Sequence, residues 1–87
     1  MKSYLAKVVV TLKPSILDPQ GVAVRTGLLS MGYSDVDSVR LGKFIEVRLK
    51  ADDEAAARAM VDEISKKLLA NLVMERYEFT VAEEVAE

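Results

Sequence analysis

Residues 16–21, with the sequence Ile-Leu-Asp-Pro-Gln-Gly, constrain the fold of this chain most, because they predict a sharp junction between a strand and a helix. Asp18 can accept hydrogen bonds from the first free N–H groups of the helix, and Pro19 suits the first helical position. Gly21 and Gly27 follow inside the helix, where each costs about 1 kcal/mol relative to alanine. We therefore expect the sheet or a partner to pack closely against the helix at both glycines.

Periodic apolar residues predict six elements along the chain, by alternation for strands and by helical spacing for helices. Their β-α-β-β-α-β order is typical of the α+β class. Right-handed crossovers then give a two-layer sandwich with two helices on one face of an antiparallel sheet. The predicted elements are a strand at 4–12, a helix at 19–31 stopped by Gly32, strands at 35–41 and 44–50 joined by a two-residue turn at Gly42 and Lys43, a helix from 52 or 53 to 71, and a strand at 73–81.

The second predicted helix has one apolar face and one charged face. Its first turn is acidic, its last turn is basic, and oppositely charged residues recur four positions apart. This distribution suits the helix dipole and a solvated outer face, so we interpret the charges as solvation and not as a binding site. The stripe expected to be buried comprises Ala57, Met60, Val61, Ile64 and Leu68.

The sheet face without helices is predicted to be a mixed surface. This face has more apolar residues than a surface exposed to bulk water and more charged residues than a core. Such a mixture suits a protein interface. The residues expected there are Leu5, Lys7, Val9, Phe44, Glu46, Arg48, Met74 and Arg76.

Size and composition exclude several classes of protein. The 87 residues predict a single domain, 1–87, with a thin core that oligomerisation would help, and 82–87 is expected to be a short, flexible acidic tail. The chain has no cysteine and no histidine, which argues against catalysis and transition-metal binding. Its net charge of −2 argues against nucleic-acid binding. With no apolar stretch long enough for a membrane and no signal peptide, we expect a cytoplasmic protein.

Few side chains suggest chemistry. The carboxylates of Asp18, Glu46 and Glu75 have no spacing that brings two of them together, and capping is the favoured role for Asp18. Arg40 and Lys43, with Arg48 nearby, could grip a phosphate or a carboxylate on a partner, or could simply keep a turn soluble. The residues thus indicate a binding or assembly component, with no catalytic residues in this chain.

Several segments, taken in order, resemble the PurS family, the small subunit of phosphoribosylformylglycinamidine synthase. The resemblance spans about residues 4–81, and one departure is Leu72, where the family commonly has proline. The segments that carry it are Val10-Thr11-Leu12-Lys13, Leu17-Asp18-Pro19-Gln20-Gly21, Val39-Arg40-Leu41-Gly42-Lys43, Glu46, and Ala70-Asn71 followed by Val73-Met74-Glu75 and Tyr77.

The resemblance implies a role in purine biosynthesis without chemistry in this subunit. It implies a homodimer, or a homotetramer, that joins a large synthetase subunit to a glutaminase subunit so that ammonia passes between them. ATP and Mg²⁺ would be used by the synthetase partner, with no cofactor in this chain, no nucleic acid and no membrane. The residues it suggests at the interface with partners are Asp18, Pro19, Gly21, Arg40, Gly42, Lys43 and Glu46.

Three other classes share a similar order of elements. An acylphosphatase would need an arginine-bearing phosphate loop after the first strand, and residues 13–17 contain no arginine. An RNA-recognition fold would need aromatic residues on its central strands for base stacking. A small-molecule-sensing domain of the ACT kind stays as the alternative, and ligand binding by the isolated protein would distinguish it from an assembly subunit.

Overall fold

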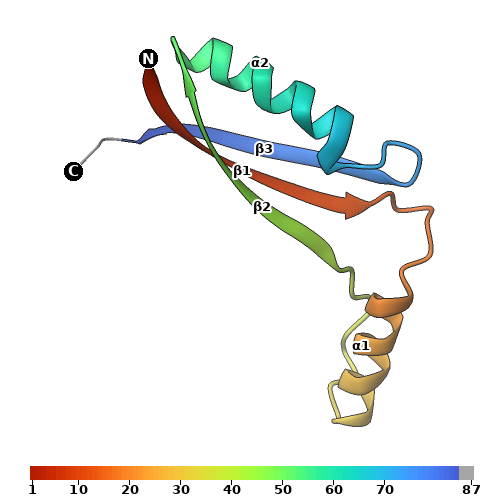
Figure 1. The fold of residues 1–87 in the computed structure, drawn as a ribbon. Helices are drawn as coiled ribbons and strands as arrows, with labels where there is room; N and C mark the ends of the chain where they lie inside the picture. The colour runs from red at the N-terminus through yellow and green to blue at the C-terminus, as the bar shows by residue number, and fades with distance from the viewer. Residues whose placement is uncertain (85–87) are drawn as a thin grey trace.

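A computed structural model describes residues 1–84 as a three-stranded antiparallel sheet with two helices (Figure 1). Its class is α+β, as predicted. The elements are β1 (Lys2–Leu12), α1 (Pro19–Ser30), β2 (Gly42–Ala51), α2 (Glu54–Ile64) with a π-helical turn η1 (Ser65–Leu69), and β3 (Glu75–Glu84).

The sheet has the order β2-β1-β3, with β1 in the centre. Val8 of β1 lies opposite Ile45 of β2 and Phe79 of β3 in the antiparallel register. Alternate residues of β1 are fully or almost fully buried beneath α2, which packs on one face of the sheet (Figure 1). The predicted two-faced pattern of β1 is therefore confirmed, and the residues that it buries are Tyr4, Ala6, Val8 and Val10.

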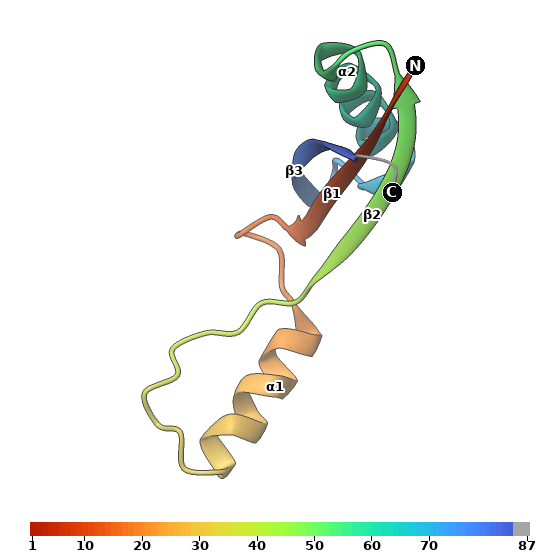
Figure 2. The same ribbon diagram turned by 90° about the vertical axis from the view of Figure 1, so that its left-hand side faces the viewer.

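Helix α1 lies away from the sheet and does not cover it beside α2. It extends past the end of β1 at which β2 begins (Figures 1 and 2), and Gly21 is its single buried residue. The prediction placed both helices on one sheet face, and for α1 this position is wrong. Of the two helices, α2 alone packs on the sheet.

The displacement of α1 follows from residues 35–41, which form no strand. Their sequence, Asp-Val-Asp-Ser-Val-Arg-Leu, contains residues that disfavour strands and favour turns. The segment runs beside α1, below the sheet (Figure 2), so nothing draws α1 back over the strands. The predicted turn at Gly42 and Lys43 is also wrong, because Gly42 pairs with Thr11 and Lys43 with Val10 as the first residues of β2.

Helix α2 begins as predicted and ends differently. The Asp53 side chain accepts a hydrogen bond from the Ala56 N–H and caps the helix. Ala57, Val61 and Ser65 are fully buried, whereas Met60 is 43% exposed and Leu68 is 83% exposed. The π-helical turn explains the exposure of Leu68. Its wider winding rotates the last residues around the helix axis and places Leu69, in place of Leu68, against the core.

Strand β3 is shifted toward the C-terminus relative to the prediction. A turn closed by Asn71, whose Oδ1 accepts a hydrogen bond from the Val73 N–H at 3.1 Å, leaves Val73 exposed. The strand continues to Glu84, which pairs with Ser3, so residues 82–84 belong to the sheet and not to a tail. The rest of the predicted tail, 85–87, lies outside the described residues. No helix within residues 1–84 has the length and apolar character to traverse a bilayer.

Candidate functional site

Asp18 fastens the start of α1 to the segment that leads into β2. Its side chain is 4% exposed, and the two carboxylate oxygens have different partners. Oδ1 accepts a hydrogen bond from the Gly21 N–H at 2.9 Å, which is the predicted helix cap. Oδ2 accepts one from the Leu41 N–H at 2.8 Å. This second bond spans 23 residues of chain, and no local sequence signal could have predicted it.

These hydrogen bonds favour the charged form of the carboxyl group. The Leu41 and Gly21 N–H groups hold the pKa of Asp18 below its ordinary value, in that order of importance. Burial opposes the shift, and the nearby Arg40 guanidinium assists it. Asp18 is therefore a structural carboxylate and is poorly suited to act as a general acid.

Gly21 allows the backbone at residue 39 to approach α1. A Cβ atom at Gly21 would lie 2.2 Å from the carbonyl oxygen of Val39, far inside any normal contact. The close packing predicted at this glycine is confirmed. At Gly27 a Cβ would meet no atom within 4 Å, so the sheet does not pack there and a partner stays the predicted neighbour.

Arg40 completes the junction from the other side. Its guanidinium donates hydrogen bonds to the Ile16 carbonyl at 3.0 Å and to the Lys13 carbonyl at 2.7 Å. Residues 13–16 link β1 to α1, so Arg40 ties that loop to the entry into β2. We refer to Asp18, Pro19, Gly21 and Arg40 as the α1 corner, a set of four residues that the structure brings together.

The other three residues predicted at an interface lie on β2, outside the α1 corner. At Gly42 a Cβ would come within 2.6 Å of the Val10 carbonyl oxygen, so the glycine permits close strand pairing. The Lys43 Nζ lies 3.7 Å from a Glu75 carboxylate oxygen. Glu46 is exposed and lies opposite Lys7 of β1. The predicted residues thus form two groups. Four belong to the α1 corner and are engaged within the chain, and three lie on β2.

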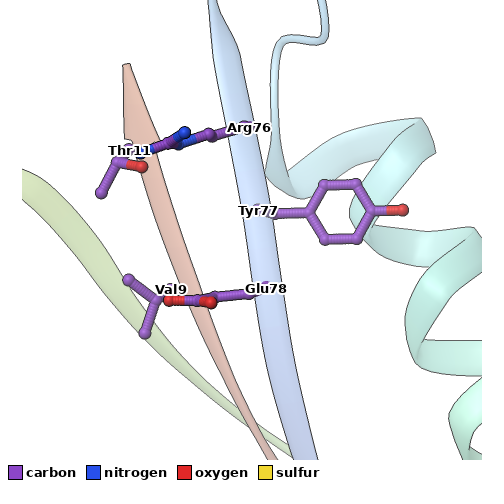
Figure 3. Close-up of a pocket in the computed structure, with 5 residues that line it drawn as sticks. All are labelled: Val9, Thr11, Arg76, Tyr77 and Glu78. Atoms are coloured by element: carbon purple, nitrogen blue, oxygen red, sulfur yellow. The ribbon is translucent and has the colours of Figure 1, made fainter. Parts of the chain in front are cut away.

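The sheet face opposite α2 is open, as predicted. Figure 3 shows Val9, Thr11, Arg76 and Glu78 on this side, whereas Tyr77 of the same strand points toward α2. All five residues contribute atoms to the lining of a shallow hollow of about 390 Å³. Phe44 is 61% exposed, so the face combines apolar and charged groups.

Helix α1 and the residues beside it expose an apolar surface that the sequence analysis did not predict. A helix with so little buried surface gains little from packing within its own chain, although tertiary packing usually supplies most of a helix's stability. Val22 and Val24 lie on opposite sides of the helix, so the exposed apolar side chains surround α1 and do not form a single face. We call this surface the α1 arm, and its exposed apolar residues are Leu17, Val22, Val24, Met31 and Tyr33.

The arrangement within residues 1–84 provides binding surfaces more than reactive groups. No group of three or more His, Cys, Asp or Glu side chains in this part of the chain could hold a metal ion. The most strongly positioned carboxylate, Asp18, is committed to backbone N–H groups. What the geometry offers is an apolar arm held at a fixed junction and an open, charged sheet face.

Comparison with known proteins gives consistent matches over most of the chain. The family model described as PurS, phosphoribosylformylglycinamidine (FGAM) synthase, matches residues 5–83. The phosphoribosylformylglycinamidine synthase subunit PurS of Synechocystis is 49% identical over 79 residues, which are 91% of this chain and 79% of that protein.

Two solved structures have the same fold. PurS from Thermus thermophilus is 37% identical with a TM-score of 0.85, over 95% of this chain and 99% of that one. PurLQS from Thermotoga maritima includes a chain that is 28% identical with a TM-score of 0.84, over 97% of this chain and 100% of that one. These matches do not favour the ACT-like alternative.

Proposed function

The chain belongs to the PurS family of phosphoribosylformylglycinamidine synthase subunits, and from this premise we propose that it joins a large synthetase subunit to a glutaminase subunit. It performs no chemistry itself. By holding the two larger subunits together it supports the transfer of ammonia from one to the other during purine biosynthesis. The resemblance to a chain of PurLQS from Thermotoga maritima supports a three-component assembly.

The α1 arm is the observation that carries this proposal. Met31 is 71% exposed and Tyr33 is 57% exposed at its far end, where a monomer in water gains nothing from apolar side chains. The α1 corner fixes the arm through Asp18 and Arg40, so little conformational freedom is lost when a partner binds it. A fixed apolar projection is suited to inserting between two larger surfaces.

The residues expected at the interface then act in two ways. Asp18, Pro19 and Gly21 act indirectly, because they set the direction of α1 and are engaged within the chain. Gly42 has the same indirect role at the start of β2. Arg40 also acts indirectly, because its guanidinium is bound to the Ile16 and Lys13 carbonyls. The exposed side chains of Lys43 and Glu46 meet the larger subunits directly, with their charged ends.

The assembly has further components. The chain acts as one domain and associates with itself as a homodimer or homotetramer, which would compensate for its thin core. ATP and Mg²⁺ bind to the synthetase partner and no cofactor binds to this chain. The pathway places the complex in the cytoplasm, and neither nucleic acid nor membrane is a partner.

Reconstitution tests the proposal. Glutamine-dependent product formation by the synthetase and glutaminase should rise when this chain is added, whereas ammonia-driven synthesis should depend on it less. The double variant Met31→Ser/Tyr33→Ser should lose at least about half of the stimulation, because it removes the apolar end of the α1 arm. The control is Leu68→Ser, which changes an even more exposed apolar residue, in η1, and should leave stimulation unchanged.

Two results would contradict the proposal in different ways. Equal glutamine-driven rates with and without the chain would remove the assembly role. Full stimulation by the Met31→Ser/Tyr33→Ser variant would leave assembly intact but move the contact away from the α1 arm.

A further inference from the structure

A second hollow lies where the open sheet face meets the α1 corner, and we call it the arginine hollow. Its volume is about 430 Å³. No aspartate or glutamate within residues 1–84 contributes to its lining, although the whole chain has a net charge of −2. The hollow therefore favours an anion, against the net charge of the molecule. Two arginines, two hydroxyl side chains and two apolar residues line it: Arg40, Arg76, Thr11, Ser38, Leu12 and Pro14.

The pairing of the strands creates this space. Thr11 of the central strand lies opposite Arg76 of β3 on one side and opposite Gly42 of β2 on the other. Figure 3 shows the Arg76 side chain extending from β3 toward Thr11. Gly42 has no side chain, and a Cβ there would lie 2.8 Å from the Thr11 methyl carbon. The β2 side of this row therefore stays empty, and Ser38 and Arg40 line the space beside it.

Arg40 is held in place and keeps donors for a ligand. Its two terminal nitrogen atoms, Nη1 and Nη2, donate to the backbone carbonyls of Ile16 and Lys13. A guanidinium also has an Nε–H and a second N–H on each terminal nitrogen, and these are not used in the two hydrogen bonds. Because the group is already fixed, it loses little conformational freedom when it binds an anion.

Arg76 has no ion-pair partner within residues 1–84. The neighbouring Glu75 is paired with Lys43, and strand alternation places both on the sheet face that α2 covers. Glu78 shares the open face with Arg76, but it lines the hollow of Figure 3 and not the arginine hollow. The exposed Arg76 guanidinium is therefore available to an anion in the arginine hollow.

The donors in the arginine hollow suit a phosphate group better than a carboxylate. A carboxylate has two oxygens in one plane, and a single guanidinium can satisfy both as a bidentate pair. A phosphate monoester has three free oxygens in a tetrahedral arrangement, so it can accept hydrogen bonds from two guanidinium groups and a hydroxyl together. The volume of about 430 Å³ is also within the usual range for sites that hold small organic molecules.

We propose that the arginine hollow binds the phosphate group of a small phosphate monoester. Its two arginines hold the phosphate oxygens, and the hydroxyl groups of Thr11 and Ser38 donate to them. The organic part of the ester lies along the open sheet face toward Val9, because the hollow of Figure 3 shares Thr11 and Arg76 with the arginine hollow. This ligand site is additional to the assembly role of the proposed function and does not depend on it.

NMR titration of the isotope-labelled full chain with inorganic phosphate tests the site. At an ionic strength held constant with sodium chloride, phosphate should cause saturable shifts of the backbone amides of residues 11, 38–40 and 76 and of the Nε–H groups of both arginines. Ribose 5-phosphate should bind at least as tightly as phosphate, because its sugar adds contacts along the open sheet face, whereas ribose should not bind. Acetate should bind at least about tenfold more weakly than phosphate.

Variants assign the binding to the arginine hollow. Arg76→Gln removes a charge and paired donors, so it should weaken phosphate binding at least about tenfold. The matched control Arg48→Gln removes the same charge from the open sheet face outside the hollow, and it should change phosphate affinity by no more than about twofold.

A second pair of variants introduces a charge. Ser38→Glu places a carboxylate beside the two arginines and should abolish phosphate binding. Ser34→Glu adds the same charge at an exposed position outside the arginine hollow and should preserve binding. Thermal melts check that all four variants fold.

Three results would overturn the proposal. Shifts that do not saturate, or that sodium chloride reproduces, would mean that phosphate has no site on this chain. Equal losses of affinity in Arg76→Gln and Arg48→Gln would show only a general effect of net charge. Acetate binding as tight as phosphate binding would instead make the hollow a docking point for a carboxylate. Reconstitution of the synthetase and glutaminase is measured separately, so the assembly role is judged independently of all three.

Discussion

Asp18 shows how one side chain combines a local and a long-range role. Its position before Pro19 is a local signal for the start of a helix, and the Gly21 N–H satisfies that signal. The second carboxylate oxygen binds the Leu41 N–H and fixes the chain just before β2. The direction of α1 relative to the sheet therefore depends on a residue whose sequence context indicates only a cap.

Replacing Gly21 with alanine should destabilise the fold. The new Cβ would lie 2.2 Å from the Val39 carbonyl oxygen, a contact that requires the backbone to shift. We expect a loss of about 2–3 kcal/mol in the free energy of unfolding, as is common when a packed site receives an extra group. Urea denaturation measures the change.

Gly27→Ala is the control for this prediction, since a Cβ at Gly27 contacts nothing within 4 Å. It should stabilise the chain by about 0.5–1 kcal/mol, because alanine favours the helix. Equal effects of the two substitutions would contradict the close approach of residue 39 to α1.

The contribution of Asp18 to stability should depend on pH. Its pKa is lower in the folded chain than in the unfolded chain, so the folded state holds the proton less tightly. The stabilisation is complete above the unfolded pKa, near pH 4, and is lost as the pH falls through the folded pKa. The difference in unfolding free energy between the parent and Asp18→Asn should therefore shrink as the pH falls from about 7 to about 3.

An exposed carboxylate in the same region provides the comparison for this pH effect. Asp35→Asn should change the free energy of unfolding by no more than about 0.5 kcal/mol at neutral pH, because Asp35 lies at the surface. The difference in unfolding free energy between the parent and Asp18→Asn could instead stay constant with pH. That result would show that the hydrogen bonds of Asp18 do not depend on its charge.

At the scale of elements, the end of α2 shows where a regular pattern fails. The spacing predicts an uninterrupted helix to residue 71, but the winding widens at Ser65 and brings Leu69 to the core in place of Leu68. The Ser65 hydroxyl is fully buried and has no hydrogen-bond partner among residues 1–84. A buried hydroxyl without a hydrogen-bond partner lowers the free energy of unfolding, so Ser65 is a locally destabilising residue in the core.

Ser65→Ala should therefore stabilise the chain. Removing an unsatisfied buried hydroxyl should raise the free energy of unfolding by about 1 kcal/mol. Chemical denaturation of Ser65→Ala measures the gain, and Ser38→Ala, at an exposed position, should change stability by no more than about 0.5 kcal/mol. A loss of stability in Ser65→Ala would mean that the hydroxyl is hydrogen-bonded in solution.

At the scale of the whole molecule, the chain consists of a packed sheet with α2 and a separate α1 arm. The principal extents of 52 × 33 × 15 Å are those of a flat, elongated body, and the core lies between the sheet and α2. This division predicts unequal local stability, because α1 buries almost nothing and β1 is buried on one face and paired at both edges.

Amide hydrogen exchange should report this division directly. In the isolated chain the amides of α1 should exchange at least about a hundredfold faster than those of the central strand β1, because α1 can open without disturbing the core. Addition of the synthetase and glutaminase should slow exchange in α1 and leave β1 unchanged. Unaltered exchange in α1 within the complex would place the contact elsewhere on the chain.

Features that depend on neighbouring residues can be predicted from the amino-acid sequence. These are the alternation of β1, the Asp18 cap and Pro19 start of α1, and the left-handed stop at Gly32 with φ of 97°. Each is set by the propensities of residues within a few positions of one another, so a single sequence contains the necessary information.

Three features follow from the folded chain as a whole: the position of α1, the course of residues 35–41, and the hydrogen bonds of Arg40 and Leu41 that close the α1 corner. These outcomes depend on contacts between residues more than 20 positions apart. Local preference is weak there, and the balance between burial and backbone hydrogen bonding across the whole chain selects the conformation.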